Sequence, residues 1–104
     1  MRMMMKVSFP VEKANQTIAD GSLPRNMQAI LGELKPEAAY FTTFQGKRTA
    51  FVFFDLQDPS QMPSVGEPFF LAFNAEVDLY PVMSPADLEK GLSGIEQAVR
   101  TYFK

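Results

Sequence analysis

Two neighbouring segments in the middle of the chain constrain the fold more than any other part of the sequence. Residues 38–44 (Ala-Ala-Tyr-Phe-Thr-Thr-Phe) and 48–55 (Arg-Thr-Ala-Phe-Val-Phe-Phe-Asp) are rich in the aromatic and β-branched residues that favour strands. The turn between them, Gln45-Gly46-Lys47, is short and contains a glycine. The two segments are therefore predicted to form a β-hairpin at the centre of the fold.

Both faces of this hairpin are apolar. In its second strand Ala50, Val52 and Phe54 point to one side, whereas Phe51 and Phe53 point to the other. An antiparallel sheet with one face in water normally alternates between apolar and polar residues. This hairpin does not, so we expect both of its faces to be covered.

The rest of the chain supplies two more strands and several helices. Alternating residues predict strands over 3–9 and 76–83, and Pro81 places the second of these at a sheet edge because proline cannot donate to a strand ladder. Helical spacing and capping residues predict helices over 11–19, 24–35, 67–75, 85–91 and 94–103. Residues 58–66 are expected to form a loop.

This order of elements, βαββαβ with a helical tail, is that of the ferredoxin-like split βαβ motif. The fold class is thus predicted to be α+β, with a four-stranded antiparallel sheet and helices on one face. At 104 residues the chain suits a single domain, covering residues 1–104, with one core.

If the helices cover one face of the sheet, the uncovered face is rich in phenylalanine. Monomeric proteins rarely expose so large an apolar patch. We therefore expect a homodimer in which a partner packs its own sheet against this face, with Phe41, Phe51 and Phe53 as candidate dimer-face residues. The alternative is that residues 94–103 fold back over the open face.

The element order and three short segments carry a resemblance to a known group. The segments are residues 36–41 (Pro-Glu-Ala-Ala-Tyr-Phe), 46–49 (Gly-Lys-Arg-Thr) and 81–88 (Pro-Val-Met-Ser-Pro-Ala-Asp-Leu). They resemble the dimeric α+β barrel superfamily, which includes muconolactone-isomerase-like and antibiotic-biosynthesis-monooxygenase-like proteins, and in particular an uncharacterised bacterial branch of it. The resemblance implies a homodimer and an aromatic-lined pocket between sheet and helices. The chain departs from the histidine-dependent branches because it contains no histidine.

Composition narrows the chemistry. Without cysteine or histidine there is no thiol nucleophile, disulfide, structural zinc or imidazole base, and we expect no metal and no cofactor. The 10 Lys+Arg and 12 Asp+Glu nearly balance and form no basic run longer than Lys47-Arg48, so nucleic-acid binding is not expected. No apolar stretch approaches the ~20 residues that cross a bilayer, and no signal peptide fits before Pro10. We expect a cytoplasmic protein that does not bind membranes.

Five polar side chains are candidates for ligand binding: Asn15, Tyr40, Arg48, Asp55 and Glu67. Each also has a structural interpretation. Arg48 suits a turn charge as well as a carboxylate or phosphate anchor, and Tyr40 an interface aromatic as well as an acid or base. Asp55 suits the end of its strand, Glu67 a helix first turn, and Asn15 a solvated helix face. No residue is assigned a catalytic role.

Three functional hypotheses remain open. The first, which we favour, is a homodimer that binds a small apolar or aromatic molecule between sheet and helices. The second is a cofactor-independent isomerase or monooxygenase-like enzyme, in which Tyr40 and Arg48 would converge on one pocket. The third is a structural or interaction module without a ligand. The sequence leaves open whether the protein is an enzyme.

Overall fold

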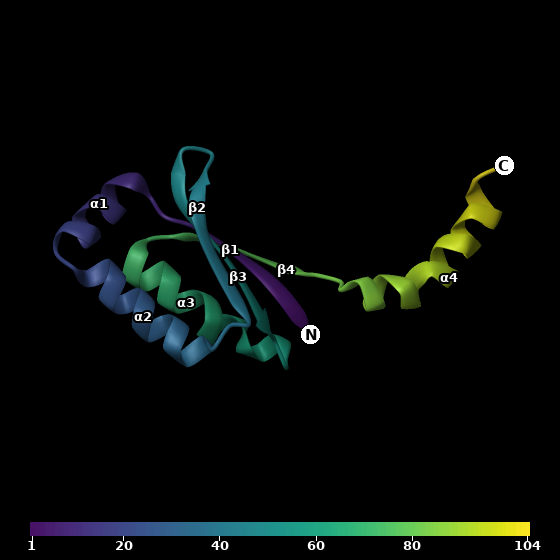
Figure 1. Cartoon of the computed structure of the whole chain (residues 1–104), viewed down its shortest axis with the longest axis horizontal. Helices are drawn as coiled ribbons and strands as arrows, with labels where there is room; N and C mark the ends of the chain where they lie inside the picture. The colour runs from purple at the N-terminus through teal and green to yellow at the C-terminus, as the bar shows by residue number, and fades with distance from the viewer.

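The computed structural model describes residues 1–104 and contains a four-stranded antiparallel sheet with helices packed on one face (Figure 1). The strands are β1 (Arg2–Ser8), β2 (Ala38–Phe44), β3 (Lys47–Asp55) and β4 (Glu76–Pro81), in the spatial order β2-β3-β1-β4. The helices are α1 (Val11–Ala19), α2 (Ser22–Leu34), α3 (Met62–Phe73), which follows a 3₁₀ turn at Pro59–Gln61, and α4 (Pro85–Tyr102). The predicted α+β, ferredoxin-like fold is confirmed, and β4 with its Pro81 lies at a sheet edge as expected.

The core lies between the sheet and helices α1–α3. Met5 in β1 pairs with Val52 in β3 and with Leu79 in β4, so these side chains share the helix-covered face. The buried apolar residues are Met3, Met5, Val7, Phe9, Ala14, Met27, Ala50, Val52, Phe54, Leu56, Phe69, Phe73 and Ala75. Every buried side-chain nitrogen or oxygen has a hydrogen-bond partner.

The central hairpin closes through a tight turn. Gln45 and Gly46 both adopt positive φ, 53° and 79°, between the last paired residues Phe44 and Lys47. Two consecutive positive φ values are typical of the type I′ turn, whose twist matches that of the flanking strands. The register set by this turn places Phe51 and Phe53 on the face opposite the core.

The prediction of a loop over residues 58–66 is wrong, because most of this segment is helical. Asp58 caps this region, accepting a hydrogen bond from Ser60 N at 2.9 Å, and α3 begins at Met62. Pro63 lies in the first turn of α3, where its missing N–H costs nothing. Gly66 is buried within the helix, beside Phe70 and Val77. Pro63 and Gly66 thus belong to a helix and do not mark a loop.

The predicted break between two C-terminal helices is also wrong. Residues Pro85–Tyr102 form one continuous helix of 18 residues, α4. Ser84 accepts a hydrogen bond from Asp87 N at 3.1 Å, and Asp87 in turn accepts one from Ser84 N at 2.9 Å, which forms a capping box. Gly91 and Gly94 do not take positive φ, so they do not end the helix.

Helix α4 extends away from the rest of the molecule (Figure 1). It contains no buried residue. The molecule measures 60 × 29 × 20 Å, and its radius of gyration is 17.5 Å, against about 13 Å for a compact domain of this length. The C-terminal segment therefore does not fold back over the chain's own sheet. No helix of the protein combines the length and apolar character needed to cross a bilayer.

Candidate functional site

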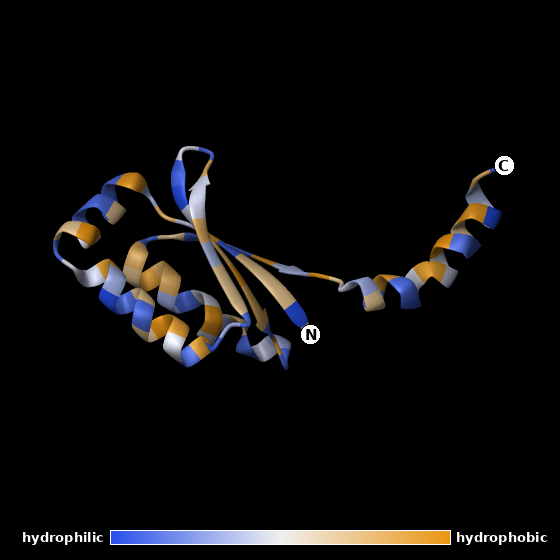
Figure 2. Cartoon of the chain, in the orientation of Figure 1, coloured by the Kyte–Doolittle hydropathy of each residue, from blue (hydrophilic) through white to orange (hydrophobic).

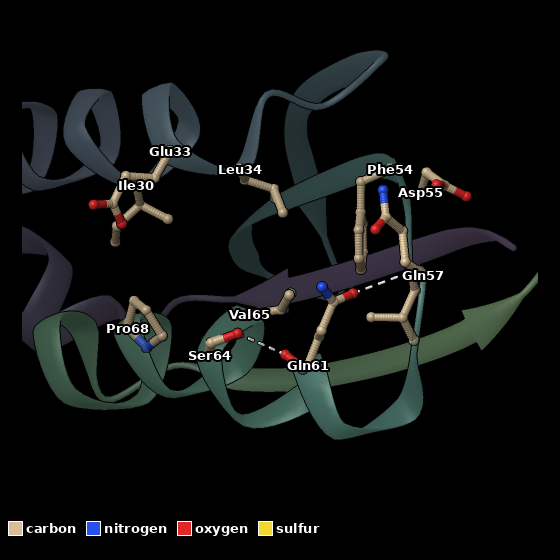
Figure 3. A pocket seen from close by; sticks show the side chains of 11 residues that line it. Ile30, Glu33, Leu34, Phe54, Asp55, Gln57, Gln61, Ser64, Val65 and Pro68 are labelled. Carbon is tan, nitrogen blue, oxygen red and sulfur yellow. Dashed lines mark hydrogen bonds between the residues drawn. The ribbon is translucent and has the colours of Figure 1, made fainter.

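A cleft of about 320 Å³ lies where the end of β3 meets α2 and α3 (Figure 3). We call it the β3-end cleft. Its lining residues are Ile30, Glu33, Leu34, Phe54, Asp55, Leu56, Gln57, Gln61, Ser64, Val65 and Pro68. The cleft therefore opens at the rim of the sheet–helix interface. The centre of that interface is filled by the core side chains.

Local hydrogen bonds shape the floor of the cleft. Gln61 Oε1 accepts hydrogen bonds from Gln57 N at 3.0 Å and Asp58 N at 3.3 Å, which turns the chain from β3 into α3. Ser64 Oγ donates to Gln61 O at 2.8 Å (Figure 3). The hydrogen bond from Ser60 lowers the pKa of the Asp58 carboxyl, which stays ionised as the cap of this turn. The polar floor is thus fixed by the helix start itself.

Apolar and polar residues line the cleft in about equal measure. Ile30, Leu34 and Val65 supply apolar surface from two helices. The carboxylate of Glu33 forms no salt bridge or hydrogen bond within the chain, and the amide nitrogen of Gln61 donates none. A ligand with an apolar body and a donor or cationic group would find partners for both parts.

Asp55 lies at the rim of the cleft and is already engaged. Its carboxylate binds the amino group of Met1 at 2.7 Å, and both groups are exposed. Asp55 also borders a second, more open cavity of about 660 Å³ beside the segment that leads to α4. In that cavity Glu37 binds Arg2, with Nε to Oε1 at 2.6 Å, and this bond raises the pKa of Arg2. Two ion pairs thus lie in the second cavity, and Asp87, which also lines it, caps α4.

The other predicted ligand-binding residues do not join the cleft. Arg48 lies at the opposite end of β3 from Asp55, where its Nη1 donates to Asn15 Oδ1 of α1 at 3.0 Å. Glu67 is exposed on α3 but outside the cleft, and because α3 begins at Met62 it is not in the first turn. Tyr40 is 64% exposed on the far side of the sheet. Tyr40 and Arg48 share no pocket, contrary to what the enzyme hypothesis requires.

No carboxylate cluster accompanies these residues. Asp55 and Asp58 are close in sequence, yet one pairs with the amino terminus and the other caps the turn. No three acidic side chains are grouped closely enough to hold a metal ion. Hard cations such as Mg²⁺ need several oxygen ligands, so the arrangement offers no built cation site.

The face of the sheet opposite the helices forms a second notable surface, which we call the open sheet face. Its apolar residues are Met4, Ala38, Tyr40, Phe44, Phe51, Phe53 and Tyr80, and the same face also carries polar residues, among them Lys6, Thr42, Thr49 and Asp78. Phe44 and Phe51 meet edge to face at 5.8 Å, and Lys6 Nζ lies 4.4 Å from the Phe44 ring. No helix of the chain covers this face (Figure 1).

The candidate dimer-face residues divide between the two faces of the sheet. Phe51 and Phe53 lie on the open sheet face. Phe41 pairs with Ala50 and therefore lies on the helix side, where it is 58% exposed near the β2 edge.

The sequence did not predict Glu33, Gln61 and Ser64 as cleft residues, because the cleft joins three elements distant in sequence. The spacing Asp58-x-x-Gln61, typical of a capped helix start, could have drawn attention to Gln61.

Comparisons with known proteins support the fold and nothing finer. No protein-family model and no curated protein matches the sequence. The crystal structure of a formyltetrahydrofolate deformylase from Pseudomonas putida KT2440 is similar over 98% of this chain, with a TM-score of 0.50 and 14% identity. The match covers 39% of that protein, so this chain spans about two fifths of its length. The chain is thus similar in fold to part of a larger enzyme, as a small α+β domain with a four-stranded antiparallel sheet.

Proposed function

We propose that this protein is a small homodimeric binding module that holds a compact organic molecule in the β3-end cleft. The observation that carries the proposal is a cleft in which an unpaired carboxylate, Glu33, adjoins an apolar wall. Ligand sites are typically concave and mostly apolar, with a few polar groups that fix orientation. A positively charged amine on a short aromatic or aliphatic body matches this combination.

The expected position of the ligand changes as a result. The sequence predicts a ligand between sheet and helices, and the interior of that interface is occupied by the buried side chains of Phe54, Phe69 and Phe73. The rim cleft has a volume of about 320 Å³, near the lower end of the ~300–1,000 Å³ range of ligand pockets. The ligand should therefore be about the size of a single ring with one polar arm.

Titration with matched fragments tests the ligand proposal. Benzylamine, followed by ¹H–¹⁵N spectra, should shift the amide signals of Gln57, Gln61 and Ser64, and benzyl alcohol should shift them less. The variant Glu33→Gln should weaken benzylamine binding by about two- to fivefold, because an exposed charge pair contributes little. Glu67→Gln removes the same charge outside the cleft and should leave binding unchanged. Shifts confined to other parts of the chain, or equal effects of the two variants, would refute the cleft assignment.

The open sheet face supports the homodimer part of the proposal. It exposes an aromatic cluster that water solvates poorly, and contiguous apolar patches of this kind mark interaction sites. A second copy is the simplest partner, because two-fold assembly buries the same surface on both chains. Light scattering after size-exclusion chromatography should give twice the chain mass of 11.7 kDa. A monomer at tens of micromolar would defeat this part of the proposal while leaving the cleft proposal standing.

A further inference from the structure

Helix α4 has a continuous apolar stripe but nothing packed against it. Leu88, Leu92, Ile95, Val99 and Tyr102 recur at helical spacing, and each is between 45% and 85% exposed. Figure 2 shows the apolar and polar residues of the extended helix side by side along its length. On the opposite side of the helix lie polar residues such as Lys90 and Gln97. The helix is thus amphipathic in the manner of one that packs on a surface.

The helix is poorly suited to exist without a partner. Its interior contains Gly91 and Gly94, and an added Cβ at either would meet no atom within 4 Å. Each glycine in a helix interior lowers helix stability by about 1 kcal/mol relative to alanine. Most helices in proteins are stabilised by packing of their apolar face. The sequence of α4 therefore requires a surface to dock on.

The chain's own open sheet face is poorly placed to be that surface. Pairing with β1 continues to Val82, whose N donates to Arg2 O at 3.1 Å, and the N-cap of α4 is already Ser84. Only Met83 lies between these two fixed points, and Pro81 and Pro85 restrict φ on either side. A short, stiff connection of this kind favours docking on another copy over reversal onto the same chain.

The open sheet face matches α4 in length and character. At 1.5 Å per residue the 18 residues of α4 span about 27 Å, and at ~3.3 Å per residue the nine residues of β3 span about 30 Å. The face presents Tyr40, Phe51 and Phe53 to an apolar stripe of similar length. Each chain thus carries one uncovered helix and one uncovered sheet face.

We propose that two copies of the chain exchange their C-terminal helices, so that α4 of each lies on the open sheet face of the other. This deepens the homodimer of the proposed function and rests on it. In a two-fold symmetric dimer of this kind each helix covers one sheet face, so no uncovered helix or sheet face remains to bind a third copy. It also explains why a helix with two glycines extends away from its own core.

Variants on the two sides of α4 test the exchange in the full chain. Ile95→Glu and Leu92→Lys, opposite in charge, should each raise the dimer dissociation constant at least about tenfold, because an unpaired charge would be buried at the contact. Gln97→Glu lies on the polar side of the same helix and should change it less than about twofold. Because α4 has no buried residue, the ¹H–¹⁵N spectra of the core should be preserved in all three.

Each outcome separates the exchange from the homodimer. If Ile95→Glu and Leu92→Lys have the same dimer dissociation constant as the wild-type chain, the helix exchange is overturned but the homodimer stands. A monomeric wild-type chain would overturn both. The chain has no cysteine, so Ile95→Cys in one copy and Phe53→Cys in a second, mass-tagged copy provide an independent check. Oxidation of the mixture should yield the mixed covalent dimer in larger amount than a mixture containing Gln97→Cys, and equal yields would overturn the exchange.

Discussion

The orientation of α3 can be tested by two substitutions at consecutive positions. Phe69 is fully buried against Phe73, with ring centroids 6.1 Å apart, whereas its neighbour Phe70 is 43% exposed. Phe69→Ala and Phe70→Ala change the same helix by the same chemistry, so the difference in helix propensity cancels between them. What remains is the difference between removing a core side chain and removing a partly exposed one.

The expected magnitudes differ severalfold. Phenylalanine-to-alanine substitution in a core costs about 3–5 kcal/mol, from the lost burial and the cavity left behind. Complete burial of Phe contributes about 1.5–3 kcal/mol, so its partial loss at Phe70, offset by the helix preference of alanine, should cost about 1 kcal/mol. The whole domain is expected to be stable by about 5–15 kcal/mol, of which Phe69→Ala would remove a large fraction.

Urea unfolding followed by far-ultraviolet circular dichroism measures both effects. With a slope of about 1–3 kcal/mol per molar urea, Phe69→Ala should lower the midpoint by about 2 M and Phe70→Ala by less than about 1 M. Protein concentration must be held fixed, because the stability of a dimer depends on it. Equal shifts, or a larger shift for Phe70→Ala, would refute the orientation of α3. The β3-end cleft would then be refuted as well, since Ser64, Val65 and Pro68 line it from this helix.

Three further substitutions probe other parts of the fold. Gly66→Ala should raise the free energy of unfolding by about 0.5–1 kcal/mol, because alanine favours the helix over glycine and the added Cβ would meet Phe70 at 3.7 Å without a clash; a lower urea midpoint would contradict this. Ser84→Ala should reduce the helical signal of α4. The Ser84 N–H lowers the pKa of Asp87 below its unfolded value, so the cap is fully present above the unfolded value and is lost as the pH falls through the lower pKa of the folded state; a helical signal that stays unchanged once Asp87 is protonated would contradict it. Arg48→Ala removes an exposed hydrogen bond to Asn15 and should change stability by less than about 0.5 kcal/mol in urea; a larger loss would give the pair a structural role.

The strands were predictable because their signal is local. β2 was predicted with its observed bounds, and alternation in β3 correctly divided its side chains between the two faces of the sheet. The predicted helix boundaries were wrong where proline and glycine are compatible with more than one structure. Pro63 can begin a helix as readily as it can occur in a loop, and Gly91 is tolerated inside a helix. Capping hydrogen bonds decide such cases, and they depend on side-chain geometry that a residue pattern does not contain.

The candidate site was predicted less well than the fold. Of the five ligand-binding candidates only Asp55 borders the cleft. The pairing of Arg48 with Asn15 joins residues 33 positions apart and could not be seen from spacing. The same is true of Glu33, which reaches the cleft only because α2 packs beside α3. The chemistry of a cleft built from three elements depends on tertiary packing, which the sequence pattern does not specify.

The position of β2 at the sheet edge affects how the protein behaves when it is concentrated or stressed. Its seven residues contain no charge and no proline, and their outer backbone groups have no strand partner. Such a segment can template hydrogen bonding between chains and seed cross-β aggregates. Glu37 precedes β2 and Lys47 follows its turn, and these charged side chains, paired with Arg2 and Glu76, oppose this growth. Neutralising Glu37 and Lys47 would therefore increase aggregation of the protein before it altered the folded structure.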